Sequence, residues 1–134
     1  MKIQETNIQE ITNKLKAYFN NRPEVKLVYI FGSLLSGKVN KFSDIDVAIL
    51  VDTKLINTNS FIYGYKAKII TYLMQALKTN AVDIVVLNEA PPFLRQRIIS
   101  QGKFIICNDE AARITLQVRT INEFNDMKFL NLPQ

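Results

Sequence analysis

Residues 45–51, Ile-Asp-Val-Ala-Ile-Leu-Val, form an almost continuous apolar run that contains a single aspartate. Such a run is typical of a β-strand that is buried on both faces, so other elements must cover the sheet on each side. Three more segments are rich in β-branched and aromatic residues. They predict further strands at residues 25–31, 82–87 and 103–107.

Amphipathic segments alternate with these strands. Apolar residues recur at helical spacing over residues 3–19 and 61–79, and Pro91-Pro92 followed by Gly102 predicts a helix over residues 92–101. A last helix, capped by Asn108 or Asp109, is predicted to reach residue 130, with one apolar stripe formed by Ile114, Val118, Ile121 and Phe124. The alternation predicts an α/β (α+β) fold, in which helices cover a small mixed sheet. The length of 134 residues fits one domain spanning residues 1–134.

The chain contains no histidine, and this excludes several classes of enzyme chemistry. Ser-His-Asp and Cys-His nucleophiles, His-ligated zinc and a histidine general base all need an imidazole. Catalysis must therefore use carboxylates, hydroxyls, lysines or a bound metal. The formal net charge of +5 is compatible with a polyanionic ligand such as a nucleotide, but the basic residues are too dispersed for a dedicated nucleic-acid groove.

The expected location is the cytoplasm. Cys107 is the only cysteine and lies in an apolar run, so we expect a small buried side chain in a reducing compartment. The first ten residues contain no apolar core of a signal peptide, and nowhere do 18 apolar residues run together. We therefore expect neither export nor a membrane span.

One motif concentrates residues with chemical potential. Gly32-Ser33 follows the first predicted strand, ten residues intervene, and Asp44-Ile-Asp46 opens the next strand. Side chains two apart on a strand point to the same face, so the two carboxylates lie side by side. Two close carboxylates repel each other unless a cation lies between them, and oxygen ligands favour Mg²⁺ or Mn²⁺ with substrate phosphates in the remaining positions.

Two further features complete this candidate site. Gly32 permits a close backbone approach to a phosphate, and Ser33 offers a hydroxyl and a backbone N–H for a triphosphate. Asp83, predicted to be buried in an apolar strand, is a third carboxylate. It can share a metal or accept a proton from an attacking hydroxyl if its strand lies beside that of Asp44 and Asp46. Each feature alone is an ordinary turn, cap or strand edge, but their combination favours a metal–phosphate site.

The spacing of Gly32-Ser33 and Asp44-x-Asp46 resembles the signature of the DNA polymerase beta-like nucleotidyltransferase superfamily. The chain as a whole resembles its minimal members, the MNT-type proteins encoded beside HEPN-domain ribonuclease toxins. The similarity includes the opening helix and several segments, namely Phe31-Gly32-Ser33, Ser43-Asp-Ile-Asp46 and residues 82–87, 88–95 and 112–120.

This resemblance implies a Mg²⁺-dependent enzyme that takes ATP and transfers AMP to a tyrosine hydroxyl of a cognate HEPN ribonuclease toxin. Such a protein is the antitoxin of a type VII-like toxin–antitoxin pair. The resemblance also implies that Gly32 and Ser33 bind the triphosphate, that Asp44 and Asp46 bind metal, and that Asp83 is the third carboxylate. Many relatives carry arginine where this chain has Ser36, and Lys38 and Lys41 are the candidates to replace its phosphate contact.

The predicted elements leave no room for a second domain that holds an acceptor, so we expect a macromolecular partner in a hetero-oligomer. Two alternatives stay open: an antitoxin that neutralises by binding alone, and a nucleotidyltransferase that acts on a small molecule or RNA. Arg95 and Arg97 are candidates for a phosphate or partner contact, although helix-surface arginines are usually only solvated. The apolar segment at residues 124–132 either docks a partner or packs on the chain's own sheet.

Overall fold

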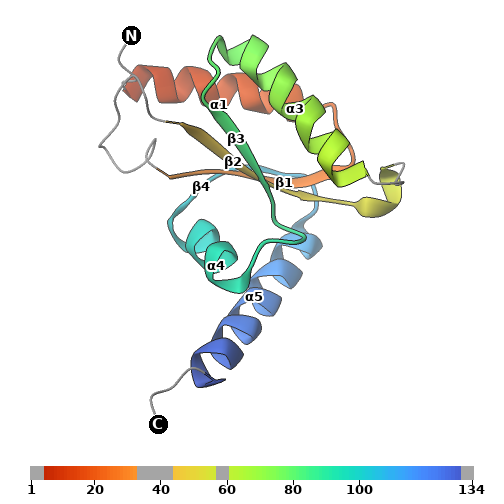
Figure 1. Ribbon diagram of the computed structural model, residues 1–134, viewed down its shortest axis with the longest axis vertical. Coiled ribbons are helices and arrows are strands. Elements are labelled where there is room, and N and C mark those ends of the chain that lie inside the picture. The colour runs from red at the N-terminus through yellow and green to blue at the C-terminus, as the bar shows by residue number, and fades with distance from the viewer. Residues whose placement is uncertain (1–4, 33–43, 57–60, 131–134) are drawn as a thin grey trace.

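A mixed sheet forms the centre of the part of the chain that this computed structural model describes, namely residues 5–32, 44–56 and 61–130. The described strands are β1 (Val25–Phe31), β2 (Ile45–Val51), β3 (Val82–Val86) and β4 (Lys103–Cys107), in the order β3-β2-β1-β4. β1 is antiparallel to both β2 and β4, whereas β2 and β3 are parallel. The predicted class, a small mixed sheet covered by helices, is confirmed (Figure 1).

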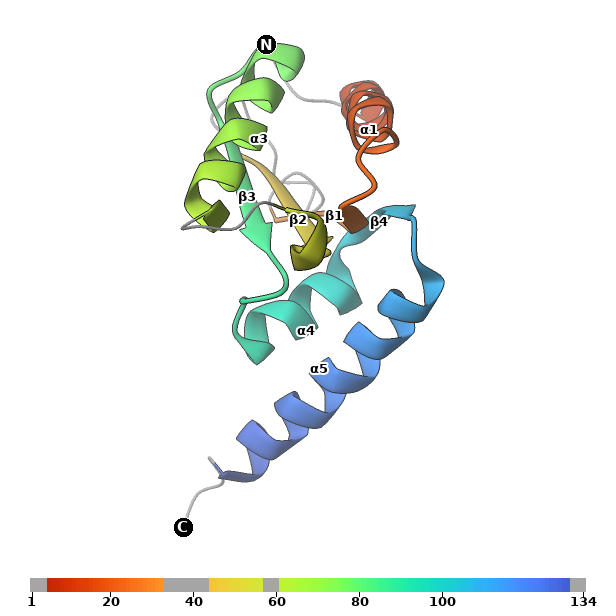
Figure 2. The ribbon, with the colours of Figure 1, turned by 90° about the vertical axis from the view of Figure 1, so that its right-hand side faces the viewer.

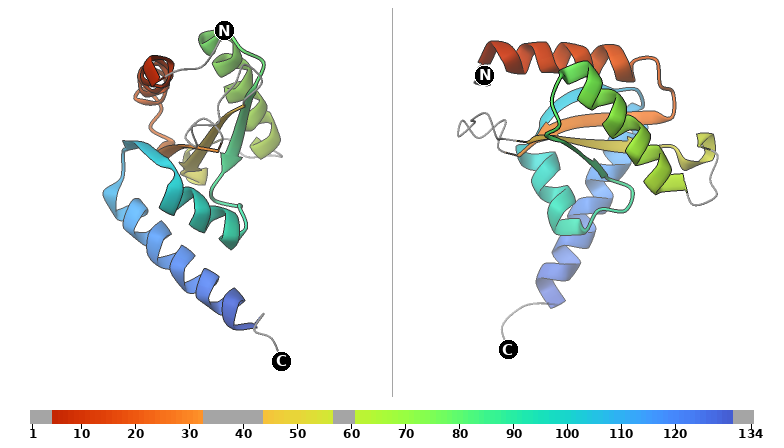
Figure 3. Two further views of the ribbon diagram at one scale, coloured as in Figure 1. Left: turned by 90° about the vertical axis from the view of Figure 1, so that its left-hand side faces the viewer. Right: turned by 45° about the horizontal axis from the view of Figure 1, so that its top comes forward.

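Helices cover both faces of this sheet. α1 (Glu5–Phe19) and α3 (Phe61–Leu77) lie on one face, and α4 (Pro92–Gln101) and α5 (Glu110–Leu130) lie on the other (Figures 2 and 3). A short 3-10 helix, η1 (Thr53–Leu55), follows β2 and was not predicted from the sequence. The helices cover the apolar strand β2 on each side, as its composition requires.

The strands alternate their side chains between two apolar cores. Val28 and Ile30 join the core under α1 and α3, whereas Leu27 and Tyr29 join the core against α4 and α5. A register shift between Val25 and Leu27 inserts one extra residue into β1. Because a bulge of this kind reverses the alternation, Val25 points to the same core as Val28.

The apolar stripe predicted for α5 lies on a helix with the predicted end at residue 130, but the stripe faces away from the core. Ile114, Val118 and Ile121 are 51%, 53% and 56% exposed, whereas Leu116 and Thr120 are buried. α5 therefore packs through the opposite side of the helix, and its later turns extend away from the sheet (Figure 2). Of the apolar segment at residues 124–132, Phe124 is half-buried, and the side chains from residue 127 onward lie outside the described ones.

Cys107 differs from its prediction as well. Its side chain is half-buried at the end of β4, and its thiol donates a hydrogen bond of 3.2 Å to Glu110. The predicted start of the first helix at residue 3 lies outside the described residues. Within the described ranges, no helix is long and apolar enough to cross a membrane.

Candidate active site

The carboxylate pair lies at the start of β2. Asp46 is the second residue of β2 and is half-buried, and Asp44 is exposed just before the strand. β1 pairs with this end of β2 through Phe31 and Asp46. The fold therefore places the pair beside the end of β1, from which the Gly32 turn departs.

The parallel pairing of β2 and β3 brings the third carboxylate to the same place. Asp46 and Asp83 are direct partners in the register, which fulfils the condition that the sequence left open. Asp83 is nevertheless exposed, so the prediction that it is buried is wrong. β3 is the edge strand, and its core-facing neighbours Val82 and Ile84 point the other way. Asp83 Oδ1 accepts a hydrogen bond of 2.9 Å from the backbone N–H of Ile84.

The carboxyl group of Asp46 lies near two other acidic side chains. Burial is the main cause that raises the pKa of its carboxyl, and the charges of Asp44 and then Asp83 raise it further. A carboxylate in this position gains most from a nearby cation, because a cation offsets both the desolvation and the repulsion. Asp44 and Asp83 thus act electrostatically on Asp46, although Asp83 comes from a distant part of the chain.

Gly32 brings the backbone against this cluster. It has a φ of +84°, in the left-handed region that side chains with a Cβ rarely adopt. A Cβ at this position would also collide with Oδ2 of Asp46. The turn after β1 therefore needs glycine for two reasons, and it places backbone directly beside the Asp46 carboxylate.

The oxygen donors of this cluster suit a hard divalent cation only in combination with a ligand. Among the described residues, no three histidine, cysteine or acidic side chains gather closely enough to hold a metal ion. Two carboxylates that leave several positions for phosphate oxygens match the way in which Mg²⁺ is usually bound. Ser33, Ser36, Lys38 and Lys41 lie outside the described residues.

The two arginines of α4 have different environments. Arg97 is exposed, but Arg95 is 1% exposed and forms an ion pair with Glu123 of α5. The prediction of a solvated surface position is therefore wrong for Arg95, because this side chain is buried and joins two helices. Local sequence gave no sign of this contact, since the partners lie on different helices.

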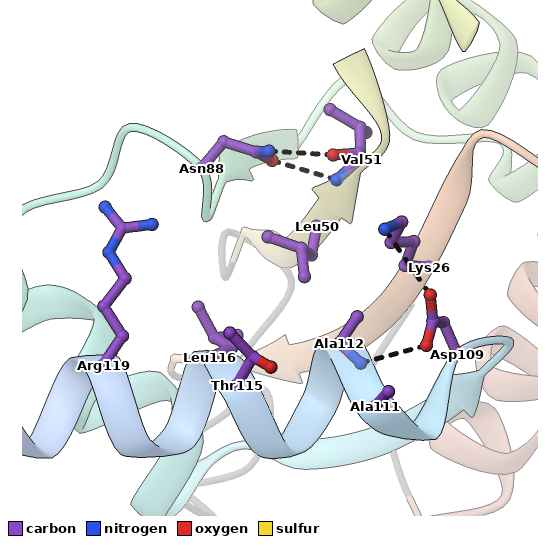
Figure 4. A pocket seen from close by; sticks show the side chains of 10 residues that line it. All are labelled: Lys26, Leu50, Val51, Asn88, Asp109, Ala111, Ala112, Thr115, Leu116 and Arg119. Atoms are coloured by element: carbon purple, nitrogen blue, oxygen red, sulfur yellow. Dashed lines mark hydrogen bonds and ion pairs between the residues drawn. The ribbon is translucent and has the colours of Figure 1, made fainter. Parts of the chain in front are cut away.

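A hollow of about 370 Å³ lies at the opposite end of the sheet (Figure 4). Its walls include Lys26 at the start of β1, Val51 at the end of β2, and Asn88. Asn88 accepts from the Val51 N–H and donates to the Val51 carbonyl, and Lys26 pairs with Asp109 at 3.5 Å. Their polar groups are used internally, so this hollow is distinct from the carboxylate cluster and offers a ligand little to bind.

A glycine turn after one strand, an acid pair on the next and a third acid on a parallel neighbour together form the candidate site. Residues 13–111 match the family described as "Polymerase beta, Nucleotidyltransferase", and the chain belongs to this family. The expectation drawn from the Gly32-Ser33 and Asp44-x-Asp46 spacing is confirmed at the level of the family.

One relative carries the name of a more specific activity within this family. The chain is 34% identical over 101 residues to the protein adenylyltransferase MntA of Shewanella oneidensis, and this match covers 75% of the chain and 66% of MntA. The chain thus spans just under two thirds of that relative's length.

Solved structures show the same fold. A crystal structure of a toxin–antitoxin with AMP-PNP has 27% identity and a TM-score of 0.70, covering 87% of this chain and 89% of that one. A complex of a tri-AMPylated Shewanella oneidensis HEPN toxin with an MNT antitoxin has 26% identity and a TM-score of 0.66, covering 90% of this chain and 88% of that one.

Proposed function

We propose that this chain is an antitoxin that transfers AMP from ATP to a tyrosine hydroxyl of a cognate HEPN ribonuclease toxin and thereby inactivates it. The observation that carries the proposal is the register of β2 and β3, which pairs Asp46 with Asp83 beside the Gly32 turn. Family membership and the names of the relatives support the reaction and the partner.

Asp44 and Asp46 are the residues that would hold Mg²⁺, together with phosphate oxygens of ATP. When bound, the ion supplies charge neutralisation at the phosphates. Burial and then the charges of Asp44 and Asp83 raise the pKa of the Asp46 carboxyl, and a bound cation would offset both causes, which supports this role. This proposal also explains why the fold tolerates a half-buried acid in an otherwise apolar strand.

The other site residues bind the triphosphate and activate the acceptor hydroxyl. The turn at Gly32 and Ser33 binds the triphosphate through backbone N–H groups and the Ser33 hydroxyl. Asp83 is exposed, so it can accept the proton of an incoming hydroxyl. The acceptor oxygen then bonds to the α-phosphorus, the bond between that phosphorus and the bridging oxygen breaks, and pyrophosphate leaves with the electron pair.

We also propose that residues 1–134 form one domain and that the protein acts in the cytoplasm, as part of a hetero-oligomer with the toxin. The exposure of Asp44 and Asp83 supports a macromolecular acceptor. A small molecule usually needs a concave site, whereas the described hollows are not lined by these acids.

The test uses ATP labelled at the α-phosphate, Mg²⁺ and the product of the neighbouring gene, which the proposal expects to be a HEPN protein. The wild-type chain is expected to transfer label to the HEPN protein, and the combined Asp44→Asn and Asp46→Asn variant to transfer none. Glu89→Gln is the matched control, since Glu89 is an exposed carboxylate in the turn after β3. Label that reaches the toxin with the double variant would refute the assigned roles.

A parallel assay separates catalysis from binding. Toxin neutralisation in cells is expected to fail with the double variant and to persist with Glu89→Gln. Undiminished neutralisation by the double variant would mean that the chain acts by occlusion alone.

A further inference from the structure

An apolar belt runs along the outer side of α5 and onto α4. We define it as Ile114, Val118, Ile121 and Phe124 of α5 with Phe93 of α4. Ile114, Val118 and Ile121 are each more than half exposed, and Phe93 is 47% exposed. Ile121 and Phe124 are one helical turn apart, and the rings of Phe124 and Phe93 meet edge to face with their centroids 5.1 Å apart. The belt is therefore continuous across two helices.

The chain's own core does not require this belt. Leu116 and Thr120 of α5 are buried and lie on the opposite side of the helix, and α5 also contacts α4 through Glu123 and Phe124. Ile114, Val118 and Ile121 belong to neither apolar core. Val and Ile at exposed helical positions also lower helix propensity relative to Ala. A shallow hollow beside the belt is lined by Ile114, Val118 and Asn122. These features describe a surface that is suited to contact another molecule.

The belt lies on the same side of the sheet as the proposed catalytic acids. Asp46 alternates with Val47 and shares its face with Ala48, which belongs to the core against α4 and α5. Asp44 and Asp83 are exposed, so the acids are open to a large acceptor but offer it little contact area. Affinity for such an acceptor must come from surfaces outside the acids.

The size of the belt distinguishes between two possible binding partners, a second copy of this chain and the protein that carries the acceptor hydroxyl. The belt consists of five side chains, four of which are 47% to 56% exposed. A stable complex usually buries about 800 Å² on each partner, so the belt alone is too small to hold two copies of this chain together. A partner that also contacts the catalytic acids needs the belt only as one part of its interface.

We propose that the apolar belt is a docking surface for the protein that carries the acceptor hydroxyl, which it binds through an apolar patch on that protein. This inference rests on the proposed function for the identity of the partner, the HEPN toxin. It adds a second contact, away from the acids, that supplies affinity rather than chemistry.

The test measures binding of the full chain to the purified HEPN protein, without ATP, by calorimetry. Val118→Asp combined with Ile121→Asp is expected to raise Kd at least tenfold, because it places charge in a desolvated apolar contact. Leu55→Asp is the matched control. Leu55 is 58% exposed on η1, outside the belt, so this variant should bind like wild type.

A second pair of variants separates docking from folding. Val118→Ala with Ile121→Ala improves helix propensity, so the melting temperature should stay or rise while Kd still increases several-fold. In AMP transfer the belt variants should raise KM for the toxin and leave kcat at saturating toxin within about twofold.

Three results would overturn the proposal. One is an unchanged Kd in both pairs of belt variants, and another is an equal loss of affinity with Leu55→Asp. The third is a dimer of the free chain that the belt variants dissociate without altering toxin binding, which would assign the belt to self-association. Loss of label transfer with intact binding would refute the catalytic proposal but would not contradict the role of the belt as a docking surface.

Discussion

Asp46 is a residue whose charged form the fold disfavours. Its pKa is raised by burial first and by Asp44 and Asp83 next, so its contribution to stability is fully present below the unfolded pKa and is lost as the pH rises through the folded pKa. We predict that Asp46→Asn raises the melting temperature of the metal-free chain at pH 7, and that the gain shrinks below about pH 4.

Thermal unfolding in a chelator, with Glu89→Gln as control, measures this effect. AMP transfer by Asp46→Asn should fall by about 100-fold or more, as is common when an electrostatic group at the reacting phosphates is lost. A variant that is both less stable at pH 7 and inactive would instead indicate that the Asp46 carboxylate supports the fold.

Two glycines allow a matched comparison of backbone requirements. Gly32 has a φ of +84°, and a Cβ there would meet the carboxylate end of Asp46, whereas Gly64 lies within α3 with nothing within 4 Å of the added carbon. We predict that Gly32→Ala lowers the free energy of unfolding by about 1–2 kcal/mol, because the left-handed backbone strains a residue with a Cβ and the Asp46 side chain must move aside. Gly64→Ala should raise it by about 0.5–1 kcal/mol. Urea unfolding of both variants checks the opposite signs, and equal signs would contradict the assigned conformations.

Elements with a strong local pattern were predictable from the sequence. The apolar runs predicted β1, β2 and β4 with their observed bounds, and the Pro91-Pro92 start and Gly102 stop did the same for α4. The pairing of Asp46 with Asp83 could not be predicted from the local sequence pattern, because it depends on the path of the chain through α3 between the two strands. The prediction that Asp83 is buried failed for a similar reason, because an apolar strand sequence does not show whether the strand lies at the edge of the sheet.

The end of α3 holds a lysine where glycine is the usual residue. Lys78 has a φ of 56°. The N–H of Thr79 donates a hydrogen bond to the carbonyl of Met74, with an N–O distance of 3.1 Å, as in a Schellman motif. We predict that Lys78→Gly raises the free energy of unfolding by about 1 kcal/mol, since glycine adopts this conformation without strain. Lys78→Ala is the control for loss of the charge, and it should give no such gain. Chemical denaturation measures both, and an equal gain from alanine would point to charge rather than to backbone strain.

At the scale of the whole molecule, the two helical layers are attached differently. α1 and α3 cover one face through a large apolar core, whereas α5 leaves the sheet after its first turns and depends on α4. The contact between them includes buried Arg95, whose Nη2 donates to Glu123, and Glu123 also pairs with Arg119 at 2.9 Å. Within the described residues, Arg95 Nε and Nη1 are buried without hydrogen-bond partners. Glu123 thus provides one of the contacts that position α5 and the apolar belt, beside the buried Leu116 and the contact of Phe124 with Phe93.

This dependence predicts an asymmetry between the two partners. Glu123→Gln leaves the Arg95 charge buried without its counterion, so it should lower the free energy of unfolding at pH 7 more than Arg95→Met does. Arg95→Met replaces a poorly satisfied cation with an apolar side chain of similar size and should stay within about 1 kcal/mol of wild type. Arg119→Met, at an exposed position, should cost no more than about 0.5 kcal/mol.

The pH dependence and a double variant complete the test. Arg119 and then Arg95 lower the pKa of the Glu123 carboxyl, so its stabilising effect is present above the unfolded pKa and is lost as the pH falls through the folded pKa. The difference between wild type and Glu123→Gln should therefore vanish in acid, because the wild-type side chain is then neutral as well. Adding Arg95→Met to Glu123→Gln should restore most of the lost stability. Urea unfolding at neutral and acidic pH measures each of these effects, and a double variant no more stable than Glu123→Gln alone would show that the buried charge is not the cause.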